Sequence, residues 1–498
     1  MTRHFYESED LLGDMLSENY FDHTRIAMRT GDILTVYSST QNEYMDLRVE
    51  VDELANPDIA KVTPMDATGR GNLIVALGSS ILAHGEIDTL ARFGHDVVGP
   101  VEWAMRRLGW RAPYVNRAVS GQTTTQMLAR VNEDVLSLRP HIVIVQNGTN
   151  EIGEGFEAIK ETTQRLYMRV LGSGAKLVAM GIAARDANSS WSSENYATMA
   201  AINEFKRRFC EAHANCYYVD TNALVMNPTT GEALPNMLRD GIHWTPTGAF
   251  KAGEQLMQVL GDILPQTDVI PTYLSTPDDE GDFTYGNESP NPAFTGISGA
   301  KGDGVTGDVH DSWIIERIGT HNSTASATIA PKSDDDPRNE VSITFTPSAA
   351  AGTDAFFFRI NPSVVVIQQP EAFYEGLMGI VAEAWDGFET ISLEVDDSGP
   401  SNKTYYDGNN IYNLPMPNAA WSGIFRTPEF LPTGNLRLRV RVAIKGEPWG
   451  QERCVSQHLC CALLTLIPAS LLSAIFRKVR RELCCHHFHI ITCAPLCP

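Results

Sequence analysis

The chain has 498 residues, 43% hydrophobic and 20% charged, so it is long enough for two or three domains with cores of their own. This balance excludes an intrinsically disordered chain, which has fewer apolar residues and more charge. Lys and Arg number 39 against 61 Asp and Glu, and the resulting formal net charge of -22 argues against nucleic acid and against anionic membranes as partners.

Residues 1–70 contain short β-like runs, such as residues 33–37, and end before a glycine-rich segment. The first residues include Glu7, Glu9 and Asp10 and no apolar run of signal-peptide length. We therefore expect a small N-terminal β-rich module without a secretory leader.

Residues 71–265 alternate between short apolar runs and longer segments with helical periodicity. The apolar runs predict five buried strands at residues 73–77, 114–119, 142–145, 177–180 and 216–219. The amphipathic segments predict helices at residues 97–108, 125–138, 156–171, 194–212 and 247–264. This alternation predicts an α/β fold, a three-layer α/β/α domain with a parallel sheet.

Residues 266–285 are rich in Gly, Pro, Asn and Asp, which is typical of a linker. Residues 286–448 then predict an antiparallel, jelly-roll-like β-sandwich that resembles carbohydrate-binding modules, with strands at 313–318, 341–345, 355–360, 364–367, 378–384, 391–395 and 436–444. Its large aromatic residues could stack on sugars, but we expect them in the core: Trp313, Tyr374, Trp385 and Trp421.

Residues 449–498 differ from the rest of the chain, since seven of the nine cysteines lie there and only Cys210 and Cys216 precede them. An uncharged run at residues 459–476 is marginal for a membrane anchor. The Cys484 to His487 cluster lacks the usual spacing of metal ligands. We favour a third interpretation, in which this segment is not part of a folded domain. A change of reading frame near residue 449 would produce such a segment.

Small and polar residues follow the first three predicted strands of the parallel sheet. Ser80 follows the first strand, Gly121 the second and Asn150 the third. Because the carboxyl ends of parallel strands meet at one edge, these three loops should lie together, where open α/β sheets bind ligands. Each loop alone is an ordinary turn, whereas the three together indicate a site.

A fourth segment, residues 239–248, precedes the last predicted helix and contains Asp240 and His243. A histidine is the usual general base near neutral pH, and a carboxylate on the same loop can fix its tautomer. Together with a serine hydroxyl, this pair indicates nucleophilic catalysis.

In order and spacing, these four segments resemble the conserved blocks of the SGNH (GDSL-like) hydrolases, a likeness that covers residues 71–265. The resemblance implies that Ser80 is the nucleophile, His243 the base and Asp240 its orienter. It implies an oxyanion hole formed by the Ser80 and Gly121 amides and the Asn150 side chain, and no metal or cofactor.

Two residues depart from the family pattern. Ser79 stands where the family has an aspartate before the nucleophile, so two adjacent hydroxyls compete for that role, and the alignment of blocks selects Ser80. Glu151 replaces the aspartate after the asparagine, where we expect support of the loop rather than chemistry.

The resemblance and the sandwich together predict a serine esterase that removes O-acetyl groups from a carbohydrate. The alternatives are a lipid, aryl-ester or thioester hydrolase of the same family, and a glycan-binding adhesin whose α/β domain is catalytically idle. We expect an acetylated polysaccharide or other small ester as partner, and neither nucleic acid nor membrane. The architecture without a leader resembles phage or prophage tail proteins acting outside the cell.

Overall fold

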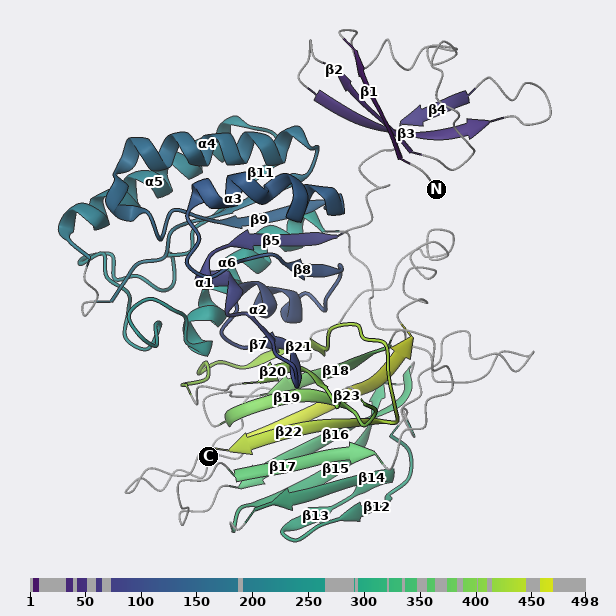
Figure 1. The fold of residues 1–498 in the computed structure, drawn as a ribbon. Coiled ribbons are helices and arrows are strands. Elements are labelled where there is room, and N and C mark those ends of the chain that lie inside the picture. The colour runs from purple at the N-terminus through teal and green to yellow at the C-terminus, as the bar shows by residue number, and fades with distance from the viewer. Residues whose placement is uncertain are drawn as a thin grey trace.

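The computed structural model describes the following residues: 3–8, 33–38, 43–51, 60–64, 73–186, 191–264, 291, 294–319, 322–333, 336–346, 356–362, 374–382, 388–400, 402–409, 414–444 and 457–468. Figure 1 shows the arrangement of their helices and strands. No helix among them is both long enough and apolar enough to cross a membrane.

Four strands lie within residues 1–70, where a β-rich module is predicted: β1 Arg3–Ser8, β2 Ile33–Ser38, β3 Glu43–Val51 and β4 Ala60–Pro64. They form one sheet in chain order. The β1 and β2 strands pair in parallel, and the later pairs are antiparallel.

A five-stranded parallel sheet forms the centre of residues 73–264, which we call the α/β domain. Its strands are β5 Ile74–Gly78, β8 Tyr114–Asn116, β9 Ile142–Gln146, β10 Lys176–Met180 and β11 Cys216–Val219. Their order is β11-β10-β9-β5-β8, and every pair is parallel. All five predicted strands are present.

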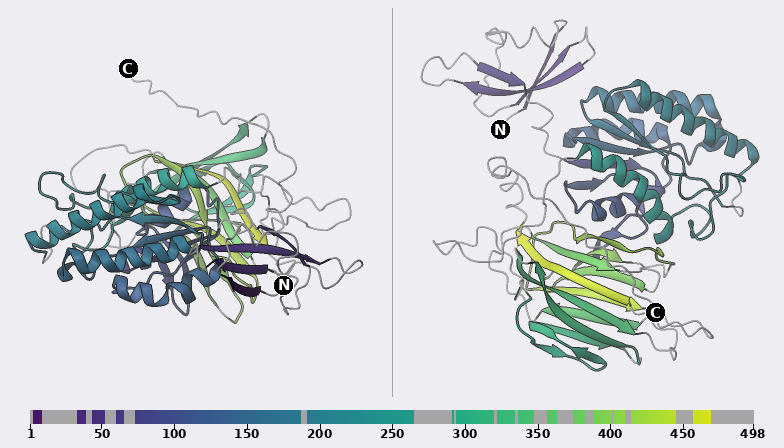
Figure 2. Two further views of the ribbon diagram at one scale, coloured as in Figure 1. Left: turned by 90° about the horizontal axis from the view of Figure 1, so that it is seen from above. Right: turned by 180° about the vertical axis from the view of Figure 1, so that it is seen from behind.

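Helices cover both faces of this sheet (Figures 1 and 2). Successive strand residues point to opposite faces, so Ile74 and Ala76 pack with α2 Pro100–Arg107 and α6 Pro246–Ile263. Val75 and Leu77 pack on the other face with α3 Thr124–Arg130, α4 Phe156–Gly172 and α5 Ser193–Ala212. The hydrophobic effect on two faces therefore fixes the three layers.

The helix predicted at residues 125–138 is shorter than expected. The α3 helix ends at Arg130 and is followed by a π-helical turn, Val131–Val135, and a 3-10 turn, Leu136–Leu138. Val131 and Val135 are both buried in the core beside the sheet. The apolar periodicity of the sequence continues to residue 138. Burial of these two side chains against the sheet is met there by a π-helical turn instead of a regular α-helix.

The remaining strands form two sheets that pack as a β-sandwich, and residues 294–468 within it are called the sandwich domain. Its strands are β12 Ser298–Lys301, β13 Val305–Gly307, β14 Val309–Ile318, β15 Thr324–Ser333, β16 Asp336–Thr346, β17 Phe356–Pro362, β18 Tyr374–Ala382, β19 Phe388–Asp397, β20 Thr404–Asn409, β21 Trp421–Arg426, β22 Leu436–Ile444 and β23 Gln457–Pro468. Most neighbours are antiparallel, so the predicted fold class is confirmed.

Six of the seven strands predicted in this region overlap observed strands, and residues 364–367 lie outside the described residues. Three of the four aromatic residues singled out are buried core residues: Trp313, Tyr374 and Trp421. Trp385 lies outside the described residues. The strands that were missed, such as β15, alternate small and polar residues and have a weak apolar pattern.

The C-terminal segment requires a correction. We expected residues 449–498 to lie outside any folded domain, but Gln457–Pro468 forms β23, which pairs with β16 on one side and β18 on the other. Charged side chains are typical of edge strands, where they discourage further pairing, so an uncharged segment suits a strand with a neighbour on each side. The Cys484 to His487 cluster lies outside the described residues.

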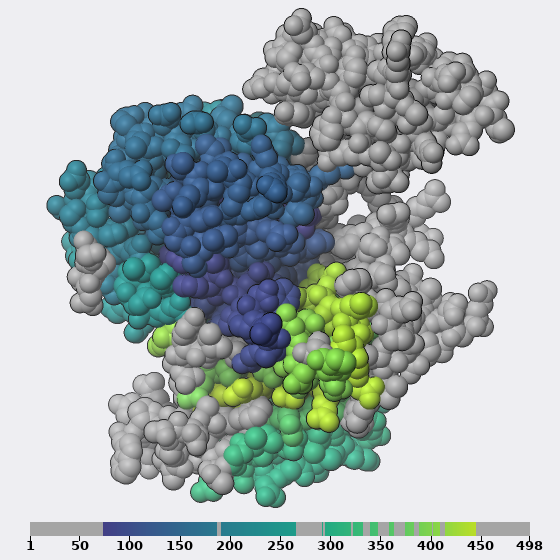
Figure 3. Space-filling view, viewed as in Figure 1, coloured from purple at the N-terminus to yellow at the C-terminus, as the bar shows by residue number. Residues whose placement is uncertain are grey.

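The α/β domain contributes two strands to the sandwich. After the first strand of the parallel sheet the chain forms a hairpin, β6 Glu86–Asp88 and β7 Arg92–Asp96, and β7 pairs in parallel with β20. Figure 3 shows the dark blue surface around this hairpin against the green surface of the sandwich. The two parts of the molecule therefore share one eight-stranded sheet, β12-β14-β17-β22-β19-β20-β7-β6.

Buried polar contacts also join the two domains. The Arg106 guanidinium lies 2.5 Å from the Asp407 carboxylate, and both side chains are fully buried. The Trp110 indole N–H donates to the Ile424 carbonyl at 2.9 Å, and Trp103 packs edge-on against Trp421. Since breaking a buried ion pair is costly, we expect these contacts to hold the two domains in one orientation.

Candidate active site

Ser80 begins a one-turn helix, α1 Ser80–Ala83, directly after β5. Its hydroxyl oxygen lies 2.9 Å from Nε2 of His243, although the two residues are 163 positions apart in the chain. Ser80 is 9% exposed, so its hydroxyl lies at the base of the edge rather than on a protruding surface. The predicted meeting of serine and histidine at this edge is therefore observed.

The loop that carries His243 is closed by its own hydrogen bonds. Leu238 and Trp244 form an isolated antiparallel bridge, and the Arg239 amide donates to the His243 carbonyl at 2.9 Å. Gly241 at the tip has a φ of 81°, a conformation that favours glycine. Thr245 then caps α6, with Pro246 in its first turn. These local features hold the imidazole in place.

Asp240 contacts the other side of the same imidazole. Its Oδ2 lies 2.8 Å from Nδ1 of His243, and its Oδ1 accepts hydrogen bonds from the Ile242 and His243 amides. Partial burial raises the pKa of Asp240, but the hydrogen bonds from His243 and Ile242 outweigh it and hold the pKa below its ordinary value. The carboxylate therefore stays ionised and suits the role of orienting His243.

The two adjacent serines have different surroundings. The Ser79 hydroxyl donates to Oε1 of Gln146 at 3.2 Å, in a buried network that continues from Gln146 to Thr149. Only the Ser80 hydroxyl has a described hydrogen bond to the imidazole. The structure thus distinguishes the two hydroxyls, which the sequence left in competition.

Hydrogen bonds tie the Gly121 and Asn150 loops to the Ser80 loop. The Val119 amide donates to the Gly78 carbonyl at 3.0 Å, and the Asn150 side-chain amide donates to the Gln122 carbonyl at 2.8 Å. Gly121 has a φ of 79° and open space where a Cβ would stand. Glycine is therefore favoured there by backbone conformation, and its amide is not covered by a side chain of its own.

Glu151 supports the Asn150 loop, as expected from its position. Its Oε1 accepts from the Thr124 amide at 2.7 Å and contacts the Thr124 hydroxyl, at the start of α3. Beneath it, the buried Lys206 ammonium donates to the Asn147 and Met180 carbonyls at 2.8 and 3.1 Å. Burial lowers the pKa of Lys206 to about 7, with the Glu151 carboxylate opposing the change. Both side chains therefore support the loop through buried hydrogen bonds.

Sequence reasoning missed one histidine next to the site. The His84 ring lies 4.5 Å from the His243 ring, and its Nδ1 lies 2.8 Å from the Arg239 guanidinium. Since a guanidinium only donates, His84 is the tautomer with its proton on Nε2. Burial and the neighbouring His243 and Arg239 lower the pKa of His84 to about 4. His84 lies four residues after Ser80, and residues four apart lie on the same face of a helix. A predicted helix at α1 would therefore have placed His84 close to Ser80.

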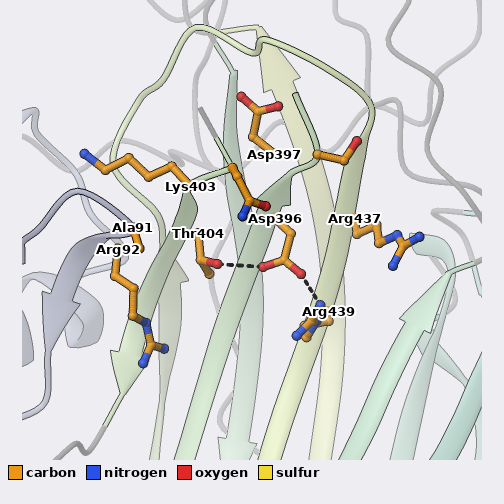
Figure 4. A pocket seen from close by; sticks show the side chains of 10 residues that line it. Ala91, Arg92, Asp396, Asp397, Lys403, Thr404, Arg437 and Arg439 are labelled. Carbon is orange, nitrogen blue, oxygen red and sulfur yellow. Dashed lines mark hydrogen bonds and ion pairs between the residues drawn. The ribbon is translucent and has the colours of Figure 1, made fainter. Parts of the chain in front are cut away.

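A separate pocket of about 490 Å³ lies where β7 meets the ends of β19, β20 and β22 (Figure 4). Asp396 pairs with Arg439 and accepts from Thr404, and Lys403 lies 3.5 Å from Asp88. Most charges in this pocket already have partners, and Arg437 on β22 is an exposed cation of its lining. Among the described residues, no group of three or more His, Cys, Asp and Glu side chains is arranged to hold a metal ion.

The parallel sheet is covered by helices on both faces, and the Ser80 hydroxyl, the His243 imidazole and the Asp240 carboxylate are hydrogen-bonded in that order where its strands end. This arrangement, with the family match, defines the class of this enzyme, a hydrolase acting on ester bonds. Residues 76–249 match the family model described as GDSL-like Lipase/Acylhydrolase family. This part of the chain is therefore similar to the GDSL-like hydrolases, the same resemblance that the sequence motifs indicated.

Several solved structures are similar to a part of the chain. One is a GDSL-like lipase from Bacteroides thetaiotaomicron, with 18% identity over 39% of this chain and 87% of that chain, and a TM-score of 0.29. Another is a variant of Axe2, an acetyl-xylooligosaccharide esterase from a Geobacillus, with 20% identity over 38% and 94% of the two chains, and a TM-score of 0.33. No curated protein matches the sequence.

Proposed function

We propose that this protein is a serine esterase that removes O-acetyl or similar ester groups from a carbohydrate. The contact of 2.9 Å between the Ser80 hydroxyl and His243, with Asp240 at 2.8 Å on the other ring nitrogen, carries the proposal. In this role Ser80 is the nucleophile, His243 the general base and Asp240 the orienter of His243.

The mechanism is a two-step acyl transfer. His243 takes the proton of Ser80 as the hydroxyl oxygen attacks the ester carbonyl, and the Ser80 amide, the Gly121 amide and the Asn150 side chain donate to the oxyanion. His243 then gives its proton to the departing alcohol. Water, deprotonated by His243, attacks the acyl-enzyme, and collapse of the second tetrahedral intermediate releases the acid and restores Ser80.

The carbohydrate part of the proposal is supported by the connection between the domains. The hairpin β6 and β7 begins two residues after His84 and completes the sheet of the sandwich. A polymer held by the sandwich would therefore be held beside the segment that carries Ser80. The expected place of action, outside the cell on a virion or tail, stays a prediction, as do the domain boundaries.

Acetate release separates the candidate functions. Purified protein is given acetylated xylan and nitrophenyl esters of increasing acyl length, and both products are measured. We expect the highest kcat/KM with acetyl esters and release of acetate from the polymer. A preference for long acyl chains would favour a lipid or aryl ester hydrolase, and binding of the glycan without turnover of any ester would favour the adhesin.

Replacement of Asn150 by alanine tests the oxyanion hole. Loss of one donor should lower kcat by about 10²–10³-fold, because the donor acts on charge that develops only in the transition state. Steady-state kinetics with nitrophenyl acetate measures the change. The control is Asn132→Ala, an exposed asparagine just after α3, which should leave kcat unchanged. A decrease of less than threefold in Asn150→Ala would contradict this role.

A further inference from the structure

Arg185 is a buried cation without an ion pair. It lies in the loop after β10 and is 5% exposed, and its Nη1 is buried without a hydrogen-bond partner. No carboxylate of the described residues forms an ion pair with its guanidinium. Other buried arginines of the protein differ, since Arg106 lies 2.5 Å from Asp407 and Arg426 lies 2.6 Å from Glu375.

The backbone around Arg185 is fixed against the loop that carries His243. The Ala233 amide and the Tyr196 hydroxyl both donate to the Arg185 carbonyl, at 2.7 and 3.3 Å. The next residue, Asp186, donates its amide to the Gly241 carbonyl at 3.5 Å. Arg185 therefore belongs to a segment that packs directly on the tip of the catalytic loop.

The guanidinium remains charged in this environment. Burial lowers the pKa of Arg185 to about 10, and the carboxylate of Asp240 is the foremost of the groups that oppose this change. At neutral pH the side chain is therefore a cation near the proposed active site. Its central carbon lies 4.9 Å from the centre of the Trp191 ring, an arrangement that holds the side chain without using its N–H groups.

Asp240 and Asp186 act on Arg185 electrostatically, but neither forms an ion pair with it among the described contacts, and Nη1 has no acceptor. A buried N–H without an acceptor is unfavourable for folding, so a structural role does not account for it. Groups of this kind occur where a ligand supplies the missing partner. The net charge of -22 does not attract acidic molecules over long range, so an anion at this edge depends on a local cation. The guanidinium is suited to this because its planar donors match the two oxygens of a carboxylate.

We propose that Arg185 binds a carboxylate of the ester substrate, so that the preferred substrate is acidic. This inference rests on the proposed esterase function and specifies its substrate class. The carboxylate can belong to the carbohydrate that carries the ester, as in a uronic acid, or to the acyl group, as in a half-ester of a dicarboxylic acid.

Kinetics of Arg185→Gln and Arg185→Lys in the full chain test this. Two of the substrates are neutral, nitrophenyl acetate and acetylated xylan. The other two carry a carboxylate, nitrophenyl hemisuccinate on the acyl group and acetylated polygalacturonate on the sugar. In Arg185→Gln we expect kcat/KM for at least one acidic ester to fall about 10- to 100-fold, chiefly through KM, and for the neutral esters to stay within twofold. Arg185→Lys should be intermediate.

The matched control is Arg165→Gln, which removes one cation from an exposed position in α4 and should alter no rate constant. A wild-type enzyme that hydrolyses neutral esters and gains nothing from a carboxylate on either side would overturn the inference while leaving the esterase function intact. An equal loss on neutral and acidic esters in Arg185→Gln would also overturn it.

Unfolding midpoints supply a readout that does not depend on turnover. Because Arg185→Gln removes a buried charge that has no ion pair, its midpoint should equal or exceed that of the wild type, and a clearly lower midpoint would indicate a structural role. Succinate or galacturonate should raise the midpoint of the wild type and not of Arg185→Gln. If no ester is hydrolysed at all, the esterase proposal fails, and the presence or absence of this shift decides the role of Arg185.

Discussion

Replacing Ser80 with alanine should lower kcat for nitrophenyl acetate by about 10⁴-fold or more, because the residual rate would come only from binding and the oxyanion donors. The fold should be retained, since the change removes one hydroxyl whose described partner is the His243 imidazole at 2.9 Å. Active-site kinetics and the unfolding midpoint, measured on the same preparation, check both statements.

The matched control is the neighbouring hydroxyl. Ser79→Ala removes a hydrogen bond to Gln146 in a buried network and should cost about 1–3 kcal/mol of stability while kcat stays within tenfold. The reverse result, with full activity in Ser80→Ala and inactivity in folded Ser79→Ala, would assign the attack to Ser79. Full activity in both variants would show that neither Ser79 nor Ser80 is the nucleophile.

The second large effect concerns stability. Replacing Asp407 with alanine should lower the free energy of unfolding by about 3–5 kcal/mol, because the Arg106 cation would stay buried between the domains without its partner. The same carboxylate also accepts from the Arg426 amide at 2.7 Å, so one substitution leaves two donors unsatisfied. Urea unfolding followed by tryptophan fluorescence measures the change, since Arg106 lies over the Trp103 ring and Trp103 packs against Trp421.

Two further variants define the cause. The double change Arg106→Met with Asp407→Leu removes both charges and should recover much of the loss, as is often found when a buried pair is replaced by apolar residues. Lys403→Ala disrupts the more exposed ion pair with Asp88 and should change stability by no more than about 1 kcal/mol. A loss in Asp407→Ala as small as in Lys403→Ala would show that the buried pair does not hold the domains together.

The sequence alone determined the α/β domain and the order along the chain of the segments that carry the candidate catalytic residues. Short apolar strands such as residues 142–146 are recognisable because both faces of a parallel sheet are buried, so the pattern depends on local composition. The carboxyl ends of such strands meet at one edge, and this rule brought Ser80, Gly121 and Asn150 together before any contact was known. The role of Glu151 as loop support followed from the same block of residues.

The tertiary structure decided what depends on contacts between distant segments. It separated Ser80 from Ser79 through the different partners of two identical side chains, and it placed His84 against His243. It also brought the segment of Arg185 and Asp186 onto the loop of Gly241. It also assigned residues 86–96 and 457–468 to the sheets of the sandwich. Strand pairing and the burial of charge are set by neighbours far along the chain, and no local periodicity carries that information.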